Sequence, residues 1–270
     1  AEEDMVMKLG FIGCGNMAGA IIGGILRNRV CNPEEIIGSA LTEDGRKKAE
    51  QAYGIRVTTN NNQVVQEADI IFLSVKPQYY EDVMNEIKEN ICDDKIFVSI
   101  APGKTLEWME SILGKTAKIV RTMPNTPALV GEGMTAVCSN SKVTAQELEE
   151  VKKIFAACGQ VEVVSEKLMD VVVGVSGSSP AYVFMFIEAM ADAAVADGMP
   201  RGQAYRFAAQ SVLGSAKMVL DTGKHPGELK DMVCSPGGTT IQAVRVLEKK
   251  GLRSVVFEAV DTCIKKAGGM

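Results

Sequence analysis

The first 165 residues alternate short apolar runs with longer stretches that have the spacing of amphipathic helices. The apolar runs predict strands at residues 8–12, 35–39, 68–75, 95–100, 117–122 and 134–138. The stretches at 16–27, 43–53, 78–90 and 144–158 read as helices. Runs such as Ile70-Ile71-Phe72-Leu73 are apolar throughout, as expected for strands covered on both faces. This alternation predicts an α/β domain with a doubly wound, mostly parallel sheet of the Rossmann type.

From about Lys167 onward the strand pattern disappears and helices are predicted throughout. Ser178-Ser179-Pro180 has the composition of a helix start, with a hydroxyl cap and proline in the first turn. Further helices are expected up to Leu220, at 239–250 and at 252–266. We therefore expect a Rossmann domain over 1–165 and an all-helical domain over 166–270. The second domain has more apolar surface than about 100 residues can bury alone, which predicts a dimer built through it.

Composition narrows the class of protein. Of the 270 residues, 46% are hydrophobic and 23% charged, and the net charge is −5. A mildly acidic chain without basic clusters argues against nucleic acid or an anionic membrane as partner. Seven scattered cysteines and a single histidine predict neither a disulfide framework nor a metal site. These features favour a cytoplasmic protein.

Two stretches bear on targeting. No apolar run reaches the about 18–20 residues of a membrane span, because Glu188 and Asp192 interrupt 181–196. The first six residues are acidic and precede a plausible start at Met7, so they are expected to be a non-native or frayed end.

The strongest local motif is Gly13-Cys14-Gly15-Asn16-Met17-Ala18, placed between the first predicted strand and the first predicted helix. This G-x-G-x-x-A form predicts a dinucleotide site. Gly13 would make the tight turn, Gly15 would admit the pyrophosphate, and Ala18 would let helix and strand pack closely. The free N–H groups of the helix start would hold the phosphates.

The cofactor type is expected to depend on the end of the second strand. NAD sites usually carry a carboxylate there, whereas this chain has Ser39 and Thr42 and no acid before Glu43. Arg46 and Lys47 follow one turn later. NADPH is therefore favoured over NADH, with the alternative that these cations only solvate a helix.

Further candidates follow other strands. Ser74-Val75-Lys76-Pro77 and Ala101-Pro102-Gly103 end strands where α/β proteins bind ligands, although proline and glycine also end strands for structural reasons. Asn125 and Thr126 lie between two prolines, which fits either a substrate wall or a plain turn. The only histidine, His225, precedes Pro-Gly and is expected to have a loop or cap role, with a general acid as the less favoured alternative.

The helical half contains one further candidate. Ser235-Pro236-Gly237-Gly238-Thr239-Thr240 leads into a predicted helix and joins hydroxyls to exposed backbone N–H groups. This composition suits a carboxylate, and the simpler alternative is an ordinary helix cap.

Together with Gly177-Ser178-Ser179-Pro180-Ala181-Tyr182, these motifs occur in an order that resembles the pyrroline-5-carboxylate reductases over residues 7–266. The stretch from His225-Pro226-Gly227 to Arg245-Val246-Leu247-Glu248 is the most specific part. The resemblance implies reduction of the cyclic imine pyrroline-5-carboxylate to proline, the last step of proline biosynthesis, with NADPH or more weakly NADH. It also implies a Rossmann domain plus a helical domain that joins two chains.

The resemblance assigns roles to individual residues. Cofactor contacts would come from the glycine loop, Ser39, Asn61, Ser74 to Pro77, Ala101 to Gly103, and Glu166. Substrate would be held by Ser235, Gly238, Thr239 and Thr240, with Asn125 and Thr126 nearby. Thr240 would be the catalytic hydroxyl, because it can bond the ring nitrogen while the cofactor supplies the hydride. Two rivals remain: another reductase of this design, and a dinucleotide-binding sensor without catalysis.

Overall fold

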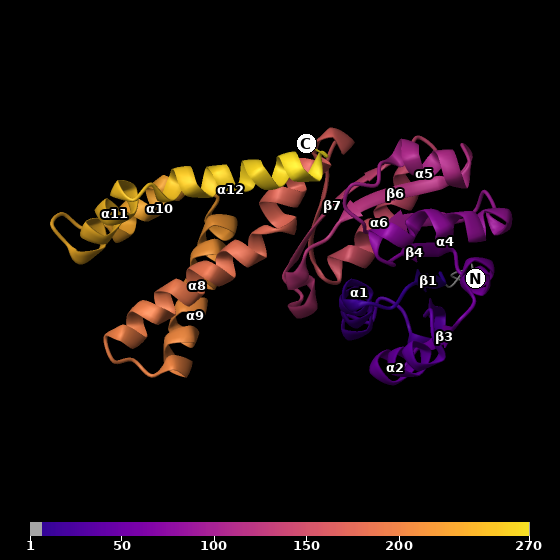
Figure 1. Cartoon of the computed structure of the whole chain (residues 1–270), viewed down its shortest axis with the longest axis horizontal. Coiled ribbons are helices and arrows are strands. Elements are labelled where there is room, and N and C mark those ends of the chain that lie inside the picture. Colours follow the sequence, from indigo (N-terminus) through magenta and orange to yellow (C-terminus); the bar gives the residue numbers. More distant parts are fainter. Residues whose placement is uncertain (1–6, 270) are drawn as a thin grey trace, which may run out of the picture. The chain divides into compact units, whose positions relative to one another are not determined.

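The chain forms two compact units in a computed structural model that describes residues 7–269 (Figure 1). The first unit extends to Gly177 and also includes the stretch from Ile264 onward, and the second is Ser178–Cys263. The six residues before Met7, expected to be a non-native or frayed end, lie outside the described residues.

One sheet organises the first unit. Its described strands are β1 (Leu9–Ile12), β2 (Ile36–Ser39), β3 (Arg56–Thr58), β4 (Ile70–Leu73), β5 (Ile96–Ser99), β6 (Lys118–Met123), β7 (Gly133–Ser139) and β8 (Gly159–Val163). They lie in the order β3-β2-β1-β4-β5-β6-β7-β8, and all pairs are parallel except β6 with β7. The order of β1 to β6 is that of the Rossmann fold, so the predicted doubly wound sheet is confirmed.

The helices of this unit are α1 (Asn16–Arg27), α2 (Glu43–Tyr53), α3 (Asn61–Glu67), α4 (Tyr80–Ile87), α5 (Leu106–Leu113), α6 (Ala145–Ala156) and the short α7 (Met169–Val172). They cover both faces of the sheet. Successive residues of a strand point to opposite faces, and strands such as β1 and β4 are apolar and buried throughout, so each face needs a layer of helices. Phe11 and Phe72 stack at 4.5 Å in the core shared with α1, α2 and α6. Ile12 and Leu73 lie in the other core, with α3, α4 and α5.

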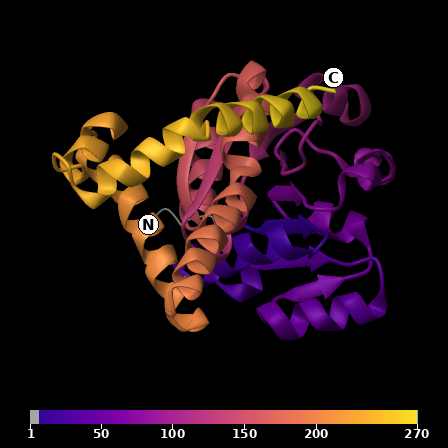
Figure 2. The same ribbon diagram turned by 60° about the vertical axis from the view of Figure 1, so that its left-hand side comes forward.

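The second unit is helical, as predicted. It contains α8 (Ser179–Ala196), α9 (Arg201–Thr222), α10 (Pro226–Val233), α11 (Thr239–Lys249) and most of α12 (Leu252–Ala267). Helices α8 and α9 pack side by side, and Figures 1 and 2 both show this pair in orange. Among the described residues of this unit the buried hydrophobic side chains are few, namely Ala191, Ala204, Ala208 and Leu229. The unit therefore leaves most of its apolar surface uncovered.

The start of α8 differs from the sequence prediction. A π-helical turn (Val173–Gly177) runs directly into α8, and Ser178 has a helical backbone with no side-chain cap. The Ser178 hydroxyl instead accepts a hydrogen bond from the Cys263 thiol at 3.2 Å. The predicted helix start is confirmed, because α8 begins at Ser179 with Pro180 in its first turn, but the predicted hydroxyl cap is wrong because Ser178 makes no cap bond.

The same continuity corrects the prediction about membrane-length segments. The helical stretch Glu166–Ala196 is long and apolar enough to cross a membrane by length and composition alone, with a mean hydropathy of 1.4. Only 6% of the apolar 18-residue window in that helix is buried. The prediction treated Glu188 and Asp192 as breaks, but an 18-residue window of this helix has at most two charged side chains and is apolar on average. One such helix is weak evidence for a membrane, and an unpaired oligomer face has the same composition.

Candidate active site

The glycine loop follows β1 at the carboxyl edge of the sheet. Gly13 has a φ of +93°, and a Cβ built on it would lie 2.9 Å from the Ser74 carbonyl oxygen. The Ser74 hydroxyl also donates to the Gly13 carbonyl oxygen at 2.6 Å. Gly13 therefore makes a tight turn that β4 holds in place, and no other residue fits there without strain.

Gly15 and the start of α1 provide an open anion site. A Cβ on Gly15 would meet no atom within 4 Å, so space is free above its backbone. The first turn of α1 has no side-chain cap and no acidic residue, which leaves its N–H groups and positive dipole end free. Asn16 is exposed, Met17 is half-buried, and Ala18 is buried against the sheet. This geometry fits a dinucleotide pyrophosphate.

Cys14 contributes to the loop in a different way. Its Sγ lies 2.5 Å from the position that a Cβ of Gly38 would take, so the side chain packs toward β2. Burial raises the pKa of the Cys14 thiol to about 11, so the thiol is neutral at physiological pH. Any contact of Cys14 with a dinucleotide would come from its backbone.

Ser39 and Asn61 meet at the end of β2. The Ser39 hydroxyl is buried and donates to Asn61 Oδ1 at 2.7 Å. The Gly13 N–H donates to the Ser39 carbonyl oxygen at 3.2 Å, which joins this pair to the glycine loop. The Asn61 amide also donates to Glu86 at 3.0 Å. Three of the predicted cofactor residues thus lie together, although they are separated by up to 48 positions in the sequence.

The polar residues that follow Ser39 have partners of their own. Thr42 caps α2 by accepting from the Gly45 N–H at 3.1 Å. Arg46 lies between Glu43 and Glu50, with Nη1 2.7 Å from Glu50 Oε1. Lys47 is exposed. Arg46 is therefore not a free cation, and its pairing was not among the sequence predictions.

The two loops predicted beside the nicotinamide are fixed by Tyr80, a residue that the sequence reasoning missed. Tyr80 is 1% exposed, and its hydroxyl donates to the Leu73 carbonyl oxygen at the end of β4. The Tyr80 hydroxyl oxygen accepts from the Ile100 N–H at 3.3 Å, beyond the end of β5. Tyr80 thereby joins the two strand ends. The signal available in the sequence was an aromatic residue opening the helix after Lys76-Pro77.

The loops themselves are open to solvent. Val75 is half-buried, and Lys76 and Pro77 are exposed. Ala101 is buried, whereas Pro102 and Gly103 are exposed, and Gly103 has a φ of +74°. Because β1, β4 and β5 are parallel, both loops lie at the same edge of the sheet as the glycine loop.

Asn125 and Glu166 each make contacts that shape loops. Asn125 accepts from the Met134 N–H at 2.8 Å and donates to the Ser176 carbonyl oxygen at 3.0 Å, while Thr126 is exposed. Glu166 Oε1 accepts from the Leu106 N–H at 2.8 Å, the first residue of α5. Glu166 also pairs with the buried Arg121 at 3.0 Å. Both side chains therefore fix the backbone of the loops around the proposed site, whether or not they also contact a ligand.

The loop of the second unit has the geometry of an anion site. Gly237 has a φ of +70°, and the Gly238 N–H donates to the Ser235 carbonyl oxygen at 3.1 Å. Gly238 opens α11 without a side-chain cap, and the first turn of that helix has no acidic residue. Ser235 and Thr239 are exposed and Thr240 is half-buried. An ordinary capped helix would have a side-chain oxygen on these N–H groups, which is absent here.

His225 has a structural role. Its Nδ1 accepts from the Gly227 N–H at 3.0 Å at the start of α10. The predicted cap role is confirmed.

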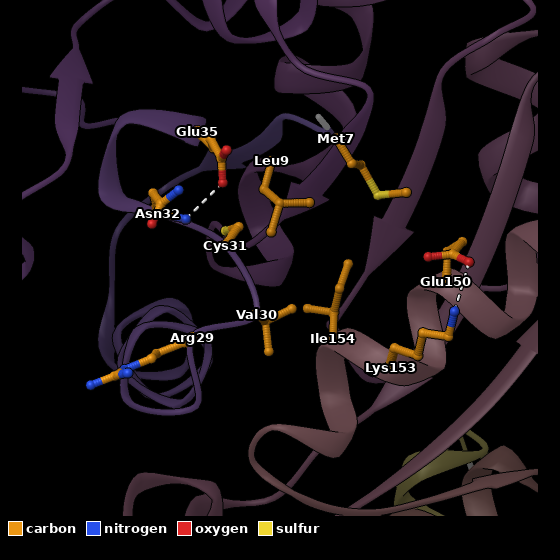
Figure 3. A pocket seen from close by; sticks show the side chains of 10 residues that line it. All are labelled: Met7, Leu9, Arg29, Val30, Cys31, Asn32, Glu35, Glu150, Lys153 and Ile154. Atoms are coloured by element: carbon orange, nitrogen blue, oxygen red, sulfur yellow. Dashed lines mark hydrogen bonds and ion pairs between the residues drawn. The ribbon is translucent and has the colours of Figure 1, made fainter. Parts of the chain in front are cut away.

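A separate cavity of about 430 Å³ lies at the opposite edge of the sheet (Figure 3). It is lined by Leu9, which opens β1, and by Glu35 just before β2. Its acidic groups already have partners, since Glu35 accepts from the Asn32 N–H at 2.7 Å and Glu150 pairs with Lys153 at 2.9 Å. The glycine loop lies beyond the far end of β1, so this cavity is not the dinucleotide site.

Comparison with known proteins agrees with this architecture. Residues 8–103 match the family described as NADP oxidoreductase, coenzyme F420-dependent. Residues 166–270 match the family described as pyrroline-5-carboxylate reductase dimerisation. The Rossmann sheet, the open glycine loop and these matches define an oxidoreductase that uses a nicotinamide dinucleotide.

Full-length relatives are more specific. The pyrroline-5-carboxylate reductase of Escherichia coli K12 is 54% identical over 97% of this chain and 98% of its own. That of Methanosarcina acetivorans is 45% identical over 94% of each. The solved structure of the Plasmodium falciparum enzyme with NADP bound has a TM-score of 0.89 at 33% identity, covering 97% of both chains. The chain belongs to the pyrroline-5-carboxylate reductase family, whose members reduce pyrroline-5-carboxylate to proline with NAD(P)H.

Proposed function

We propose that this chain binds NADPH at the carboxyl edge of its sheet and reduces 1-pyrroline-5-carboxylate to L-proline. The observation that carries the proposal is the 54% identity to the E. coli enzyme across 97% of the chain. Both uncapped helix starts, at Gly15 and Gly238, fall within residues that match family members. We assign the cofactor to residues 1–165 and the substrate loop to residues 166–270.

The roles of the cofactor residues follow from their surroundings. The α1 N–H groups would bind the pyrophosphate above Gly15, and the Ser39–Asn61 pair would face the adenosine ribose. The loops at 74–77 and 101–103, fixed by Tyr80, would line the nicotinamide. The bound nicotinamide supplies a hydride to the imine carbon. NADH would serve more weakly, because no carboxylate precedes Glu43 to hold a ribose hydroxyl.

The chain needs no dedicated acid for this reaction. An imine nitrogen is basic enough to take a proton from water near neutral pH, which makes the adjacent carbon electrophilic. The free N–H groups at the start of α11 would hold the substrate carboxylate, with Ser235, Gly238 and Thr239 around it. The Thr240 hydroxyl would bond the ring nitrogen and orient the carbon. Positioning then provides most of the rate enhancement.

The direct test is the loss of NADPH absorbance when pyrroline-5-carboxylate is added to the purified protein. Steady turnover with proline as product is the expected result. Turnover only with another imine or a hydroxy acid would contradict the proposed substrate. NADPH binding without oxidation by any imine would instead support a sensor.

We also propose that the protein is a cytoplasmic homodimer joined through the helical unit. Large apolar side chains are exposed on this unit, including Met185 at 70%, Phe257 at 74% and Leu220 at 78%. They lie in the segment that matches the dimerisation family. None of the seven cysteines is in a disulfide, which fits a reducing compartment.

A further inference from the structure

Arg46 is held by two carboxylates of its own helix. Its Nε lies 2.9 Å from both carboxylate oxygens of Glu43, and Nη2 lies 2.5 Å from Glu43 Oε1. Nη1 lies 2.7 Å from Glu50 Oε1. Glu43 therefore takes the side of the guanidinium fork that offers two parallel donors, the geometry that also suits a phosphate.

This ion pair lies next to the loop that leaves β2. Thr42 caps α2, and Glu43 is the first residue of that helix. A Cβ on Gly45 would lie 3.4 Å from the Ala40 Cβ, so the first turn of α2 lies over the residue that follows Ser39. Arg46 thus lies one helical turn beyond the loop that follows Ser39. A cation at this place can bind the 2′-phosphate of a cofactor whose ribose lies beside Ser39.

Glu43 is ionised under the conditions of the reaction. The hydrogen bond from Arg46 lowers the pKa of the Glu43 carboxyl below its ordinary value. A carboxylate at the first residue of a helix is also stabilised by the helix dipole. Glu43 thus places a permanent negative charge on the donors of Arg46 in the free protein.

We propose that Glu43 is a specificity-determining residue that competes with the cofactor 2′-phosphate for Arg46 and so limits the preference for NADP(H) over NAD(H). The inference rests on the proposed dinucleotide site. A 2′-phosphate has to displace the Glu43 carboxylate from the fork, whereas a ribose 2′-hydroxyl does not. Removing the charge of Glu43 therefore strengthens binding of 2′-phosphorylated ligands only.

The experiment compares Glu43→Gln with Asp44→Asn. Asp44 occupies the same helical turn and pairs with Lys48 at 2.7 Å, so Asp44→Asn removes an equal charge without touching Arg46. Calorimetry would give the Kd of adenosine 2′,5′-bisphosphate, AMP, NADP⁺ and NAD⁺ for each protein. We expect Glu43→Gln to tighten the two 2′-phosphorylated ligands about 3- to 10-fold and to leave AMP and NAD⁺ unchanged. Asp44→Asn should change all four by less than about 2-fold.

A second variant tests the route through Arg46. In an Arg46→Met background, Glu43→Gln should have no further effect on 2′-phosphorylated ligands. Two results would overturn the proposal. If Glu43→Gln has the same effect with and without Arg46, or if Glu43→Gln and Asp44→Asn have equal effects, the change in affinity comes from the net charge of the protein and not from competition for Arg46. Weaker NAD⁺ binding with unchanged NADP⁺ binding would also overturn it, because Glu43 would then contact the ribose hydroxyl. If the wild-type protein binds NADP⁺ and Glu43→Gln leaves all affinities unchanged, this inference is wrong and the proposed function stands. If the wild-type protein binds no dinucleotide at all, the proposed function is wrong.

Discussion

The Ser39 hydroxyl donates to Asn61 Oδ1 over 2.7 Å, which links the end of β2 to the first residue of α3. Asn61 in turn donates its amide to Glu86 of α4. The serine that the sequence places beside the ribose is therefore oriented by a residue 22 positions away. Both side chains lie next to the glycine loop, because the Ser39 carbonyl oxygen accepts from the Gly13 N–H.

This link predicts that Asn61 affects cofactor affinity through Ser39. Asn61→Ala should weaken NADP⁺ binding about 2- to 10-fold, the effect of losing one ordinary hydrogen bond. Fluorescence titration of NADP⁺ measures this change. Asn62→Ala is the matched control, since Asn62 lies next on the same helix and accepts from Asn90 instead. Equal weakening by both variants would mean that the effect comes from α3 as a whole.

The two glycines of the loop should respond in opposite ways to substitution by alanine. Gly13→Ala has to adopt a φ of +93° and meets the Ser74 carbonyl at 2.9 Å, so it should lower the free energy of unfolding by about 1–3 kcal/mol. Gly15 has a φ of −81°, and a Cβ there meets no atom, so the free energy of unfolding of Gly15→Ala should stay within about 0.5 kcal/mol of wild type. The new methyl group enters the pyrophosphate space, so NADP⁺ affinity should fall about 10-fold or more.

Urea unfolding and NADP⁺ titration of the same two proteins separate these effects. If Gly15→Ala is stable and its NADP⁺ affinity is unchanged, the pyrophosphate does not bind at this loop.

Tyr80 should be important for stability. Tyr80→Phe removes the bonds to Leu73 and Ile100 from a buried position and should lower the free energy of unfolding by about 1–3 kcal/mol. Tyr79→Phe, at a residue that is 50% exposed, should change it by less than about 0.5 kcal/mol. Urea unfolding at neutral pH measures both values. Equal values for the two variants would show that the Tyr80 hydroxyl contributes nothing.

The same residue predicts a pH dependence. Burial raises the pKa of Tyr80 from 10.0 to about 12. Because the folded pKa is the higher one, the neutral hydroxyl stabilises the fold fully below pH 10, and this contribution is lost as the pH rises toward 12. The stability gap between wild type and Tyr80→Phe should therefore narrow across that window in urea unfolding. A gap that stays constant would mean that the Tyr80 pKa is unshifted.

Local patterns predicted the elements that have strong apolar periodicity. Helices α1 and α2 begin and end at the predicted residues, because each has a loop signal on both sides. The pattern missed β3, α3, α5, β8 and α10, which have three to eight residues and little periodicity. Edge strands such as β3 and β8 gain their hydrogen bonds from a neighbouring strand, and a window of sequence does not contain that neighbour.

The site shows the same division. The glycine loop was predictable because its turn is local. The contacts of Glu166 and Asn125 were not, since Glu166 binds the Leu106 N–H from 60 positions away and Asn125 reaches Ser176 from 51. Their residue types indicated polar function without indicating the partner. The pairing of Arg46 with Glu43 was within reach of the sequence, because residues three apart face each other on a helix.

Thr240 should affect chemistry more than folding. Thr240→Val keeps the side-chain shape and removes the hydroxyl oxygen that would accept from the protonated ring nitrogen, and the loss of this bond to a charged group should lower kcat/KM about 10- to 150-fold. Thr240→Ser, which keeps the hydroxyl, should restore most of the activity. Steady-state kinetics with NADPH and pyrroline-5-carboxylate measures both, and thermal melting confirms the fold. An unchanged rate in a folded Thr240→Val protein would exclude this hydroxyl from the mechanism.

The helical unit should be the oligomer interface, because it buries few hydrophobic side chains of its own. Phe257 is 74% exposed on α12 within this unit, and an aspartate there would place a charge in the proposed interface. Phe257→Asp should therefore weaken self-association about 10-fold or more, measured by analytical ultracentrifugation over a concentration series. Leu41→Asp is the matched control, since Leu41 is 94% exposed but belongs to the first unit. If Phe257→Asp remains as fully associated as wild type, or if Leu41→Asp dissociates equally, the interface lies elsewhere.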